Sequence, residues 1–429
     1  MLACHGKLRI LQVHNSYAPG WGGEDTVVEL ERRLLSSHGH AVEQFRASHA
    51  ALKNASSARQ MLAVPGFLWS WSAYRGLQKK IAEFQPALVH VHNTFPQLSP
   101  SVFWAAHRAG VPVIQTLHNF RHICAAATLL RHGTPCEECV GRAPWPALRS
   151  RCYSRSLTRT AVVAAINWLH SQLGTYRQVD AFIVLNDFNR DVFRRGNIPI
   201  ARMLTKSNFV PLAPASEEHR ARQAVFAGSV RHSKGVPLLL EAWAAANLTG
   251  WKLLIIGDGP DREALERHWT NRAAAGGGGK TESCATLEWC GKLERSEVLR
   301  RVAASRWLLF PSLAYENCPM VVLEALSVGT PVIAADHPSL RAMIRHQSEG
   351  LLFPSGSLAS LTATLQDGLA ASDEIWTAYS RAALQAHAAR FSEEANYSEL
   401  ISIYQTAIAA RAARSCHAQT RVLAKTSGS

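Results

Sequence analysis

Short apolar runs alternate with stretches of helical periodicity along most of this chain. The runs have the length of buried strands, and between them apolar residues recur at helical spacing, as Val27, Leu30 and Leu34 do in the stretch 25–37. Strands that alternate with helices are typical of an α/β protein with parallel sheets. We therefore predict an α/β fold with strands at Leu8–Val13, Ala41–Phe45, Leu88–His92, Val113–Thr116, Ala181–Leu185, Val225–Val230, Lys252–Ile256, Arg306–Phe310 and Pro331–Ala335.

This alternation is interrupted once, near the middle of the chain. Phe209–Arg222 contains prolines followed by a cluster of charges, which indicates a linker. A chain of 429 residues is long for one core, so we predict two domains, at residues 1–213 and 214–392. A long helix with one apolar face is predicted at 393–411, and the polar, basic tail 412–429 is predicted to be disordered.

The stretch 312–336 carries the strongest sign of chemistry. Its pattern predicts a loop, a short helix with Pro319 at its first position, a turn and a buried strand. The amides of Met320 and Val321 would then point out of the N-terminus of this helix. An anion such as phosphate binds well at such a place, because the helix dipole and the free N–H groups both favour it.

Two carboxylates flank this predicted anion site, Glu316 in the loop and Glu324 inside the helix. A carboxylate can accept hydrogen bonds from sugar hydroxyls, so this pairing suggests a pocket for a nucleotide sugar. The alternative is that both are solvated charges beside an ordinary helix, which any α/β protein contains.

Polar residues in the first half follow the predicted strands, where ligands bind in open α/β sheets. Gly22 and Gly23 separate the first strand from the first helix and would let the backbone approach a ligand closely; a flexible turn is the alternative. His92, Asn93 and His118 follow two further strands. We take them as candidate pocket residues, although a histidine at a strand end is often only a satisfied polar residue.

Glu316 and Glu324 are separated by seven residues and are followed by Gly-Thr-Pro-Val-Ile. Together with the local sequence Tyr-Glu-Asn-Cys-Pro around Glu316, this block resembles the E-x7-E motif of retaining glycosyltransferases of family 4. The resemblance extends from Leu8 to about Tyr404. It implies the GT-B architecture: two doubly wound Rossmann-like domains facing a cleft, acceptor-side domain first and nucleotide-sugar domain second, with the helix 393–411 crossing back to the first domain.

The resemblance also implies a role for each candidate residue. Glu324 would hold the ribose hydroxyls of the donor and Glu316 a hydroxyl of its sugar. Lys234 and the helix N-terminus would stabilise the diphosphate as it leaves. The implied catalytic residues are Glu316, Lys234 and His118; the donor-binding residues are Glu324, Asn317, Pro319, Met320, Val321, Ser229, Arg231, Gly22 and Gly23; and the acceptor-side residues are Glu24, His92 and Asn93.

The phosphate site departs from the family pattern at one position. Ser229 stands where the family has an arginine, and Arg231 lies two residues further on. Either Arg231 substitutes for that arginine, or the phosphate site has one cation fewer. The chain contains no Asp-x-Asp sequence, so we predict no catalytic metal. Retention without an evident nucleophile implies same-face substitution, assisted by the leaving phosphate.

These features predict a metal-independent retaining glycosyltransferase that uses a nucleotide-diphosphate sugar as donor and needs no cofactor. Its acceptor would be a glycan or a lipid-linked molecule in polysaccharide or glycolipid synthesis. Two alternatives stay open. One is another GT-B enzyme with a small soluble acceptor, and the other is a non-catalytic protein that binds sugar nucleotides.

Positive charge is concentrated in the first half of the chain. Residues 1–213 carry 24 Lys and Arg against 11 Asp and Glu, a balance of +13, while the rest carries 22 against 21, a balance of +1. This asymmetry suggests an anionic partner such as phospholipid headgroups or a lipid pyrophosphate, and the chain has no recognised nucleic-acid motif. The basic, aromatic stretch 51–84 would lie on a membrane interface or, alternatively, pack in the core.

We expect a cytoplasmic protein that contacts the membrane peripherally. The chain has no run of 18 apolar residues, and its start lacks the apolar region of a signal peptide. Nine cysteines without a secretory signal argue against a disulfide framework. Four of them are spaced as in a tetrahedral structural zinc site, and reduced, unligated thiols are the alternative: Cys124, Cys136, Cys139 and Cys152.

Overall fold

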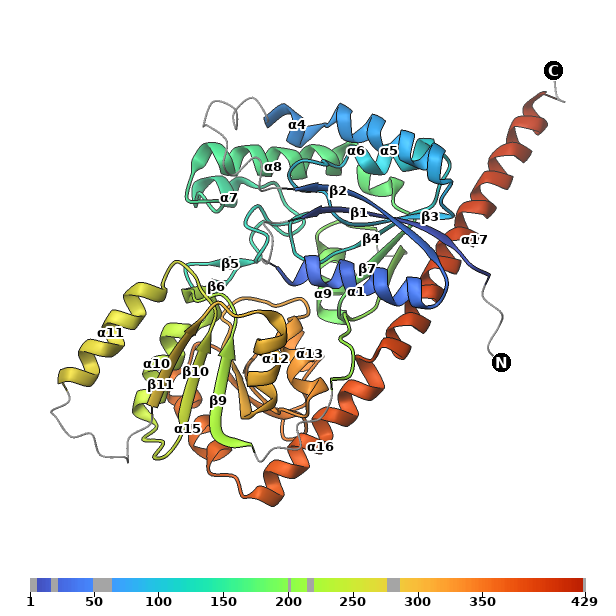
Figure 1. The fold of residues 1–429 in the computed structure, drawn as a ribbon. Helices are drawn as coiled ribbons and strands as arrows, with labels where there is room; N and C mark the ends of the chain where they lie inside the picture. Colours follow the sequence, from blue (N-terminus) through green and yellow to red (C-terminus); the bar gives the residue numbers. More distant parts are fainter. Residues whose placement is uncertain are drawn as a thin grey trace. The chain divides into compact units, whose positions relative to one another are not determined.

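The computed structural model describes residues 6–16, 22–48, 64–199, 202–213, 220–275 and 286–426. The chain divides into two compact units (Figure 1). The first unit comprises residues 1–127, 138–207 and 396–429, and the second comprises 128–137 and 208–395. Parts of the predicted linker (214–219), of the aromatic stretch (51–63) and of the tail (427–429) lie outside the described residues.

The first unit is built on a sheet of six parallel strands in the order β2-β1-β3-β4-β7-β8. Its inner strands are buried on both faces, which explains their nearly continuous apolar sequence. The chain reverses its direction of travel across the sheet at β1, whose two neighbours are β2 and β3. The strands are β1 (Arg9–Ser16), β2 (Ala41–Ser48), β3 (Leu88–Asn93), β4 (Val113–Thr116), β7 (Ala181–Val184) and β8 (Met203–Thr205).

The helices of the first unit cover both faces of this sheet (Figure 1). Several begin at a side chain that accepts a hydrogen bond from a first-turn amide, as Ser70, Ser156 and Asn186 do. The helices are α1 (Gly23–Ser37), α4 (Val64–Leu68), α5 (Trp71–Phe84), α6 (Ser101–Arg108), α7 (Trp145–Arg149), α8 (Leu157–Gln172), the 3₁₀ turn η1 (Thr175–Gln178) and α9 (Asp187–Arg195).

The long C-terminal helix α17 (Glu393–Thr426) packs on the first unit from Asn396 onward. Its buried residues Leu400, Ile401 and Tyr404 join a cluster with side chains from β1, β3 and β4. The helix end predicted at Arg411, with a disordered tail after it, is wrong, because helical structure continues to Thr426. The sequence beyond residue 411 is rich in alanine and arginine and has no glycine or proline before residue 428, so nothing in it stops a helix.

The second unit contains another sheet of six parallel strands, in the order β11-β10-β9-β12-β13-β14. Here the direction reverses at β9, which lies between β10 and β12. The predicted fold class, two doubly wound parallel sheets, is confirmed. The strands are β9 (Ala221–Ala227), β10 (Lys252–Ile256), β11 (Thr286–Gly291), β12 (Ser305–Phe310), β13 (Val332–Asp336) and β14 (Gly350–Pro354), and the unit also includes the antiparallel pair β5 (Leu130–Arg131) and β6 (Thr134–Pro135).

Helices of the second unit pack on this sheet around a core that contains the fully buried indoles of Trp243 and Trp307. Pro319 lies one position earlier than predicted, at the N-cap of α13 rather than in its first turn. The helices are the 3₁₀ turn η3 (His232–Lys234), α10 (Val236–Ala245), α11 (Arg262–Ala275), α12 (Arg295–Ala303), α13 (Met320–Ser327), α14 (Pro338–Arg341), α15 (Leu358–Leu369) and α16 (Asp373–Arg390).

Within the described residues, no helix is both long enough and apolar enough to cross a membrane.

Truncating Leu400 should destabilise the first unit. Its side chain is fully buried between α17 and the sheet, so Leu400→Ala should lower the free energy of unfolding by about 2–5 kcal/mol through lost burial and a residual cavity. Gln405 is exposed on the same helix, and Gln405→Ala serves as the control, with an expected change within about 0.5 kcal/mol. Urea unfolding measures both. Equal stabilities for the two variants would show that α17 contributes no core packing.

Candidate functional site

The second unit brings together Lys234, after β9, and Glu316, after β12. Lys234 Nζ lies 2.6 Å from Glu316 Oε1, and the Ser312 hydroxyl donates to the same oxygen at 2.6 Å. The sheet reverses its strand order at β9, so the loops after β9 and β12 lie at the point where ligands bind in doubly wound sheets. Both charged side chains are partly exposed and are therefore accessible to a ligand.

A glycine allows these two loops to approach each other. Gly235 has φ 71°, and a Cβ atom on it would lie 1.9 Å from the carbonyl oxygen of Pro311. The amide of Leu313 donates to the carbonyl of Ser233 at 3.0 Å, which ties the loop after β12 to the loop after β9. Any side chain at position 235 would push the loops apart and separate Lys234 from Glu316.

The N-terminus of α13 lies three residues beyond Glu316. Pro319 is the N-cap, and Met320 and Val321 form the start of the first turn, where amides have no partner within the helix. These residues are partly exposed, while Asn317 is buried. The arrangement therefore offers backbone N–H groups and a helix dipole to an anion.

Glu324, the second carboxylate of the motif, lies in the middle of α13 and is 7% exposed. Arg295, at the start of α12, donates to its Oε1 at 2.7 Å. The arginine side chain is about half exposed, so a hydroxyl-bearing ligand would be able to displace it. Sequence reasoning found Glu324 through the motif but missed Arg295.

Ser229 and Arg231, the two residues at which the phosphate site differs from the family pattern, are in contact. Arg231 Nε donates to the Ser229 hydroxyl at 2.9 Å, and the arginine is exposed. Ser229 thus orients Arg231 on the surface beside η3. Whether Arg231 takes over the role of the family arginine stays a prediction.

In the first unit, Glu24 at the start of α1 contacts two asparagines, one at the end of β3 and one after β4. Gly22 is the N-cap of α1, with φ 140°, and Gly23 is its first residue. Glu24 Oε1 accepts a hydrogen bond from Asn119 Nδ2 at 2.7 Å, and its Oε2 accepts one from Asn93 Nδ2 at 3.3 Å. Burial raises the pKa of the Glu24 carboxyl, and the hydrogen bond from Asn119 opposes that rise.

His92 and His118 are also brought together. Their Nδ1 and Nε2 atoms lie 3.0 Å apart, and the rings are stacked. Behind them lies Glu31, whose Oε2 is 3.5 Å from His92 Nε2 and 3.6 Å from His90 Nδ1. Burial lowers the pKa of the His92 and His118 imidazoles well below the ordinary value.

Sequence reasoning missed Glu31 and Lys206, and it noted Asn119 beside His118 without assigning it a role. A signal for Glu31 was present, because it occupies a position on the apolar face of α1, three residues from Val28 and from Leu34. A charged residue in such a stripe needs a buried partner. That partner is Lys206, which follows β8 and lies 175 positions away, so no local pattern identifies it.

The predicted zinc site is not supported. Among the described residues, one group of three side chains places its ligand atoms close enough together to hold a metal ion, and it consists of Glu31, His90 and His92. The four loop cysteines do not form such a group; Cys139 and Cys152 pack instead against a small apolar cluster with Ala147 and Val163.

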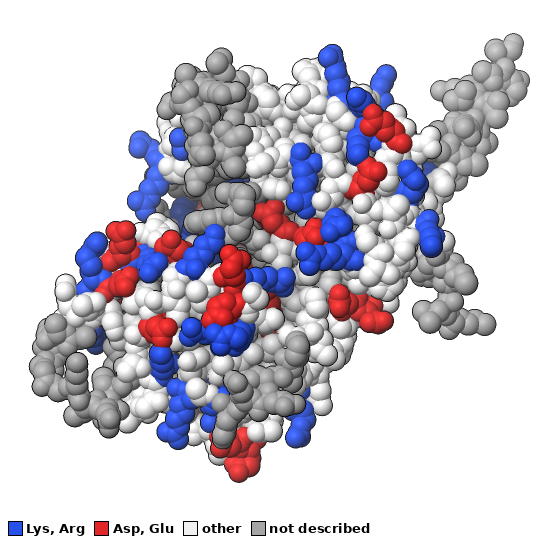
Figure 2. Space-filling view, in the orientation of Figure 1, with Lys and Arg blue, Asp and Glu red and all other residues white. Residues whose placement is uncertain are grey.

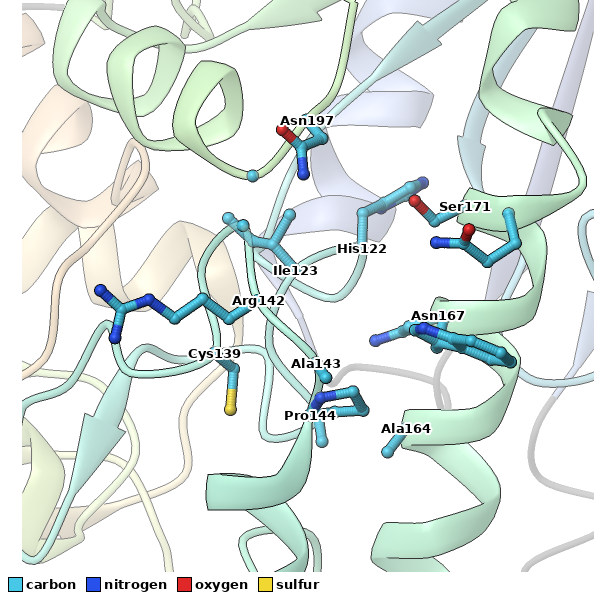
Figure 3. A pocket seen from close by; sticks show the side chains of 15 residues that line it. His122, Ile123, Cys139, Arg142, Ala143, Pro144, Ala164, Asn167, Ser171 and Asn197 are labelled. Carbon is cyan, nitrogen blue, oxygen red and sulfur yellow. The ribbon is translucent and has the colours of Figure 1, made fainter.

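A separate cavity of about 180 Å³ lies in the first unit, under the loop that carries Cys139. Ala164 and Asn167 project from α8 toward Ala143 and Pro144 (Figure 3). Apart from Cys139, none of the predicted site residues lines it, so it is distinct from the sites described above.

Comparison with known proteins identifies the family. A model described as Glycosyltransferase Family 4 matches residues 21–213, and one described as Glycosyl transferases group 1 matches residues 221–370. The chain therefore belongs to glycosyltransferase family 4, and it is a glycosyltransferase with the GT-B fold.

Individual relatives agree with this assignment. The D-inositol 3-phosphate glycosyltransferase of Mycolicibacterium vanbaalenii is 27% identical over 352 residues, which cover 79% of this chain and 72% of the relative. A structure of Anabaena HepE in complex with UDP and glucose has a TM-score of 0.59 at 15% identity, covering 92% of this chain and 99% of that one. Sucrose-phosphate synthase from Thermosynechococcus elongatus has a TM-score of 0.63 at 17% identity, covering 94% and 100%. At these identities, the structural matches establish the fold alone.

The buried histidines should make stability depend on pH. Burial, aided by the Lys206 ammonium, lowers the pKa of His90 from 6.5 to about 4, while Glu31 opposes the shift. Between these values the unfolded chain binds a proton that the folded chain does not, so stability falls as pH drops below about 6.5. As the pH falls, the free energy of unfolding of the His90→Gln variant should decrease less steeply than that of wild type, by up to about 1.4 kcal/mol per pH unit.

Urea unfolding between about pH 7 and pH 5 measures this slope. His232 is exposed, so His232→Gln is the matched control and should keep the wild-type slope. An unchanged slope in His90→Gln would contradict the assignment of a neutral, buried imidazole.

Proposed function

We propose that this glycosyltransferase moves a hexosyl group from a nucleotide-diphosphate sugar, with retention of anomeric configuration and without a catalytic metal. One observation carries the proposal: the Lys234–Glu316 pair lies in the loops beyond β9 and β12 and is followed directly by the free amides of α13. A cation and helix amides bind a diphosphate, and a carboxylate binds a hydroxyl. HepE, which has the same fold, was solved with UDP and glucose, and UDP-hexose is the donor we favour.

Each charged side chain of the second unit then has a role. The diphosphate would accept hydrogen bonds from Lys234 and from the amides of Met320 and Val321. Glu316, no longer paired with Lys234, would then accept a hydrogen bond from a hydroxyl of the sugar. The ribose hydroxyls would donate to Glu324 in place of Arg295. Because negative charge grows on the diphosphate as the glycosidic bond breaks, these fixed positive groups stabilise the transition state more than the ground state. The same leaving phosphate would accept the proton of the incoming hydroxyl on the same face.

The site in the first unit would take the acceptor and would contact the donor sugar. His118 would contact the donor sugar, and Gly22 and Gly23 would approach its phosphates. Glu24 would accept a hydrogen bond from an acceptor hydroxyl, and Asn93 and Asn119 hold its carboxylate in place.

We further propose that the acceptor lies at a membrane surface. Residues 139–179 contain no Asp or Glu, and five arginines on or beside α7 and α8 are exposed: Arg142, Arg149, Arg151, Arg155 and Arg159. Basic side chains project over the end of α7 and α8 at the left of Figure 2. Exposed apolar side chains lie among and beside them: Trp145, Leu157, Trp168 and Leu173, with Trp71 at the start of α5. Tryptophan and arginine together suit the interface of an anionic bilayer.

A small phosphorylated acceptor is the second candidate. It is favoured by the relative that acts on D-inositol 3-phosphate, a soluble anion. A basic first unit suits either acceptor, because both carry phosphate. A non-catalytic sugar-nucleotide-binding protein would need Lys234 and Glu316 to be dispensable.

Donor turnover tests the catalytic proposal. Slow hydrolysis of UDP-, GDP- and ADP-sugars should single out one donor, and Lys234→Ala and Glu316→Ala should each lower its kcat about 10²–10³-fold, as loss of one preorganised group does elsewhere. Lys252 is a partly exposed lysine on β10 of the same unit, paired with Glu288 away from the site, and Lys252→Ala should turn over like wild type. Turnover that survives both site substitutions, or binding with no turnover in wild type, would exclude this mechanism.

Vesicle binding tests the membrane proposal. Wild type should sediment with anionic phospholipid vesicles and less so as salt rises, and Arg149→Ser/Arg151→Ser/Arg155→Ser should weaken binding by about 1 kcal/mol per charge removed. Arg267 is exposed in the second unit, so Arg267→Ser is the control for loss of a surface arginine. Binding that is unaffected by the triple substitution, together with transfer to inositol phosphate in solution, would favour the small acceptor instead.

A further inference from the structure

Three polar side chains form a line from the interior of the first unit to the candidate sugar contact His118. Glu31 lies on α1, His92 at the end of β3 and His118 just after β4. Glu31 Oε2 is 3.5 Å from His92 Nε2, and His92 Nδ1 is 3.0 Å from His118 Nε2. Glu31 is fully buried and His92 is 3% exposed, while His118 is half-buried. The line therefore starts at an enclosed carboxylate and ends at the surface of the site.

The inner end of this line carries a fixed charge. Lys206 Nζ lies 3.1 Å from Glu31 Oε1 and also donates to Asn396 Oδ1 at 3.1 Å. Lys206 is 1% exposed. A buried ammonium and a buried carboxylate at this distance compensate each other's charge, whereas either charge alone would be costly in the interior. Glu31 Oε1 is thus committed to Lys206, and its Oε2 faces His92 and His90.

This charge decides which nitrogen of each imidazole carries the proton. A neutral imidazole has one N–H and one acceptor nitrogen. With Nε2 of His92 toward a carboxylate oxygen, the proton on that nitrogen is attracted, whereas a lone pair there would be repelled. His92 Nδ1 is then the acceptor, so the proton between the two rings belongs to His118 Nε2. The remaining nitrogen of His118, Nδ1, must be unprotonated.

We infer that Glu31, acting through His92, is a positioning residue that makes His118 present a hydrogen-bond acceptor, its Nδ1, to the substrate. The burial that lowers the pKa of both imidazoles supports this, because rings that stay neutral keep a defined tautomer. No hydrogen bond to Nδ1 of His118 is made by any residue that the structure describes.

The inference deepens the proposed function, and its consequence for specificity rests on that proposal. An acceptor nitrogen binds a hydroxyl and repels a phosphate oxygen, which has no proton to donate. His118 would thus select a free hydroxyl on the transferred sugar. A donor whose sugar carries a phosphate or an ether at that position would bind more weakly.

The competing interpretation is a metal ion held by Glu31, His90 and His92, whose spacing would allow one. Charge balance argues against it, because Lys206 already neutralises Glu31 and a divalent ion would add two uncompensated charges to a buried place. The two interpretations predict opposite tautomers. A metal would take the lone pair of His92 Nε2, so His92 Nδ1 would carry the proton and donate to His118 Nε2.

Nitrogen NMR of [15N]histidine-labelled wild type, recorded without added substrate, tests the inference independently of activity. Nε2 of His118 should give a protonated, pyrrole-type signal and Nδ1 an unprotonated, pyridine-type signal. The His118→Gln variant assigns these signals by their absence. A protonated Nδ1 in wild type would overturn the inference. A stoichiometric metal in the purified protein, measured by elemental analysis, would overturn it as well.

A substitution should reverse the tautomer. In Glu31→Gln, Lys206 still requires an oxygen, so the amide NH₂ turns toward His92 and donates to its Nε2; His92 Nδ1–H then donates to His118, whose Nδ1 becomes protonated. The donor KM should rise about tenfold, the effect of a mismatched hydrogen bond. Glu29 lies on the same helix and pairs with Arg32 at the surface, so Glu29→Gln should change neither signal nor KM.

Three results separate the possibilities. Inverted signals with a raised KM support the inference, and unchanged His118 signals in a folded Glu31→Gln variant would refute it. Inverted signals in a protein that never turns over a nucleotide sugar would leave the positioning role intact and would remove the proposed function alone.

Discussion

The reversal of strand order beside the first strand of each sheet is the constraint on which the sites depend. All strands of a parallel sheet end at one edge, and where the order reverses, neighbouring loops lead to opposite faces and leave a crevice. In the first unit this point lies between β1 and β3, and in the second between β9 and β12. Glu24 follows β1 and His92 lies at the end of β3, while Lys234 and Glu316 follow β9 and β12.

The ion pairs of the two units differ in their exposure to solvent. The ion pairs of the second unit, Lys234–Glu316 and Arg295–Glu324, are partly exposed, and a ligand that offers a phosphate and hydroxyls can replace each partner. The pair in the first unit, Lys206–Glu31, is enclosed and also holds Asn396 of α17. Breaking it would leave an unpaired buried charge. Exposed pairs therefore suit exchange with substrate, and the enclosed pair suits fixing the orientation of its neighbours.

Sequence patterns predicted most of the fold, and they also pointed to Lys234 and Glu316, which the fold brings into contact, because these features depend on local order. Strand lengths, helix periodicity and the spacing of Glu316 and Glu324 are all read within a few tens of residues. The misses are of another kind. Lys206 reaches Glu31 across a long separation, and the four-cysteine spacing was compatible with zinc although the fold does not gather the four side chains. Contacts of that kind are set by topology, which spacing alone does not encode.

We propose above all that the second unit binds the diphosphate of the donor through Lys234 and the N-terminus of α13. Calorimetric titration of UDP and of uridine, with wild type and with Lys234→Ala, tests it most directly. Wild type should bind UDP far more tightly than uridine, and the substitution should remove most of this difference while leaving uridine binding unchanged. Equal affinity of wild type for UDP and uridine, or a difference that persists without the lysine, would contradict it.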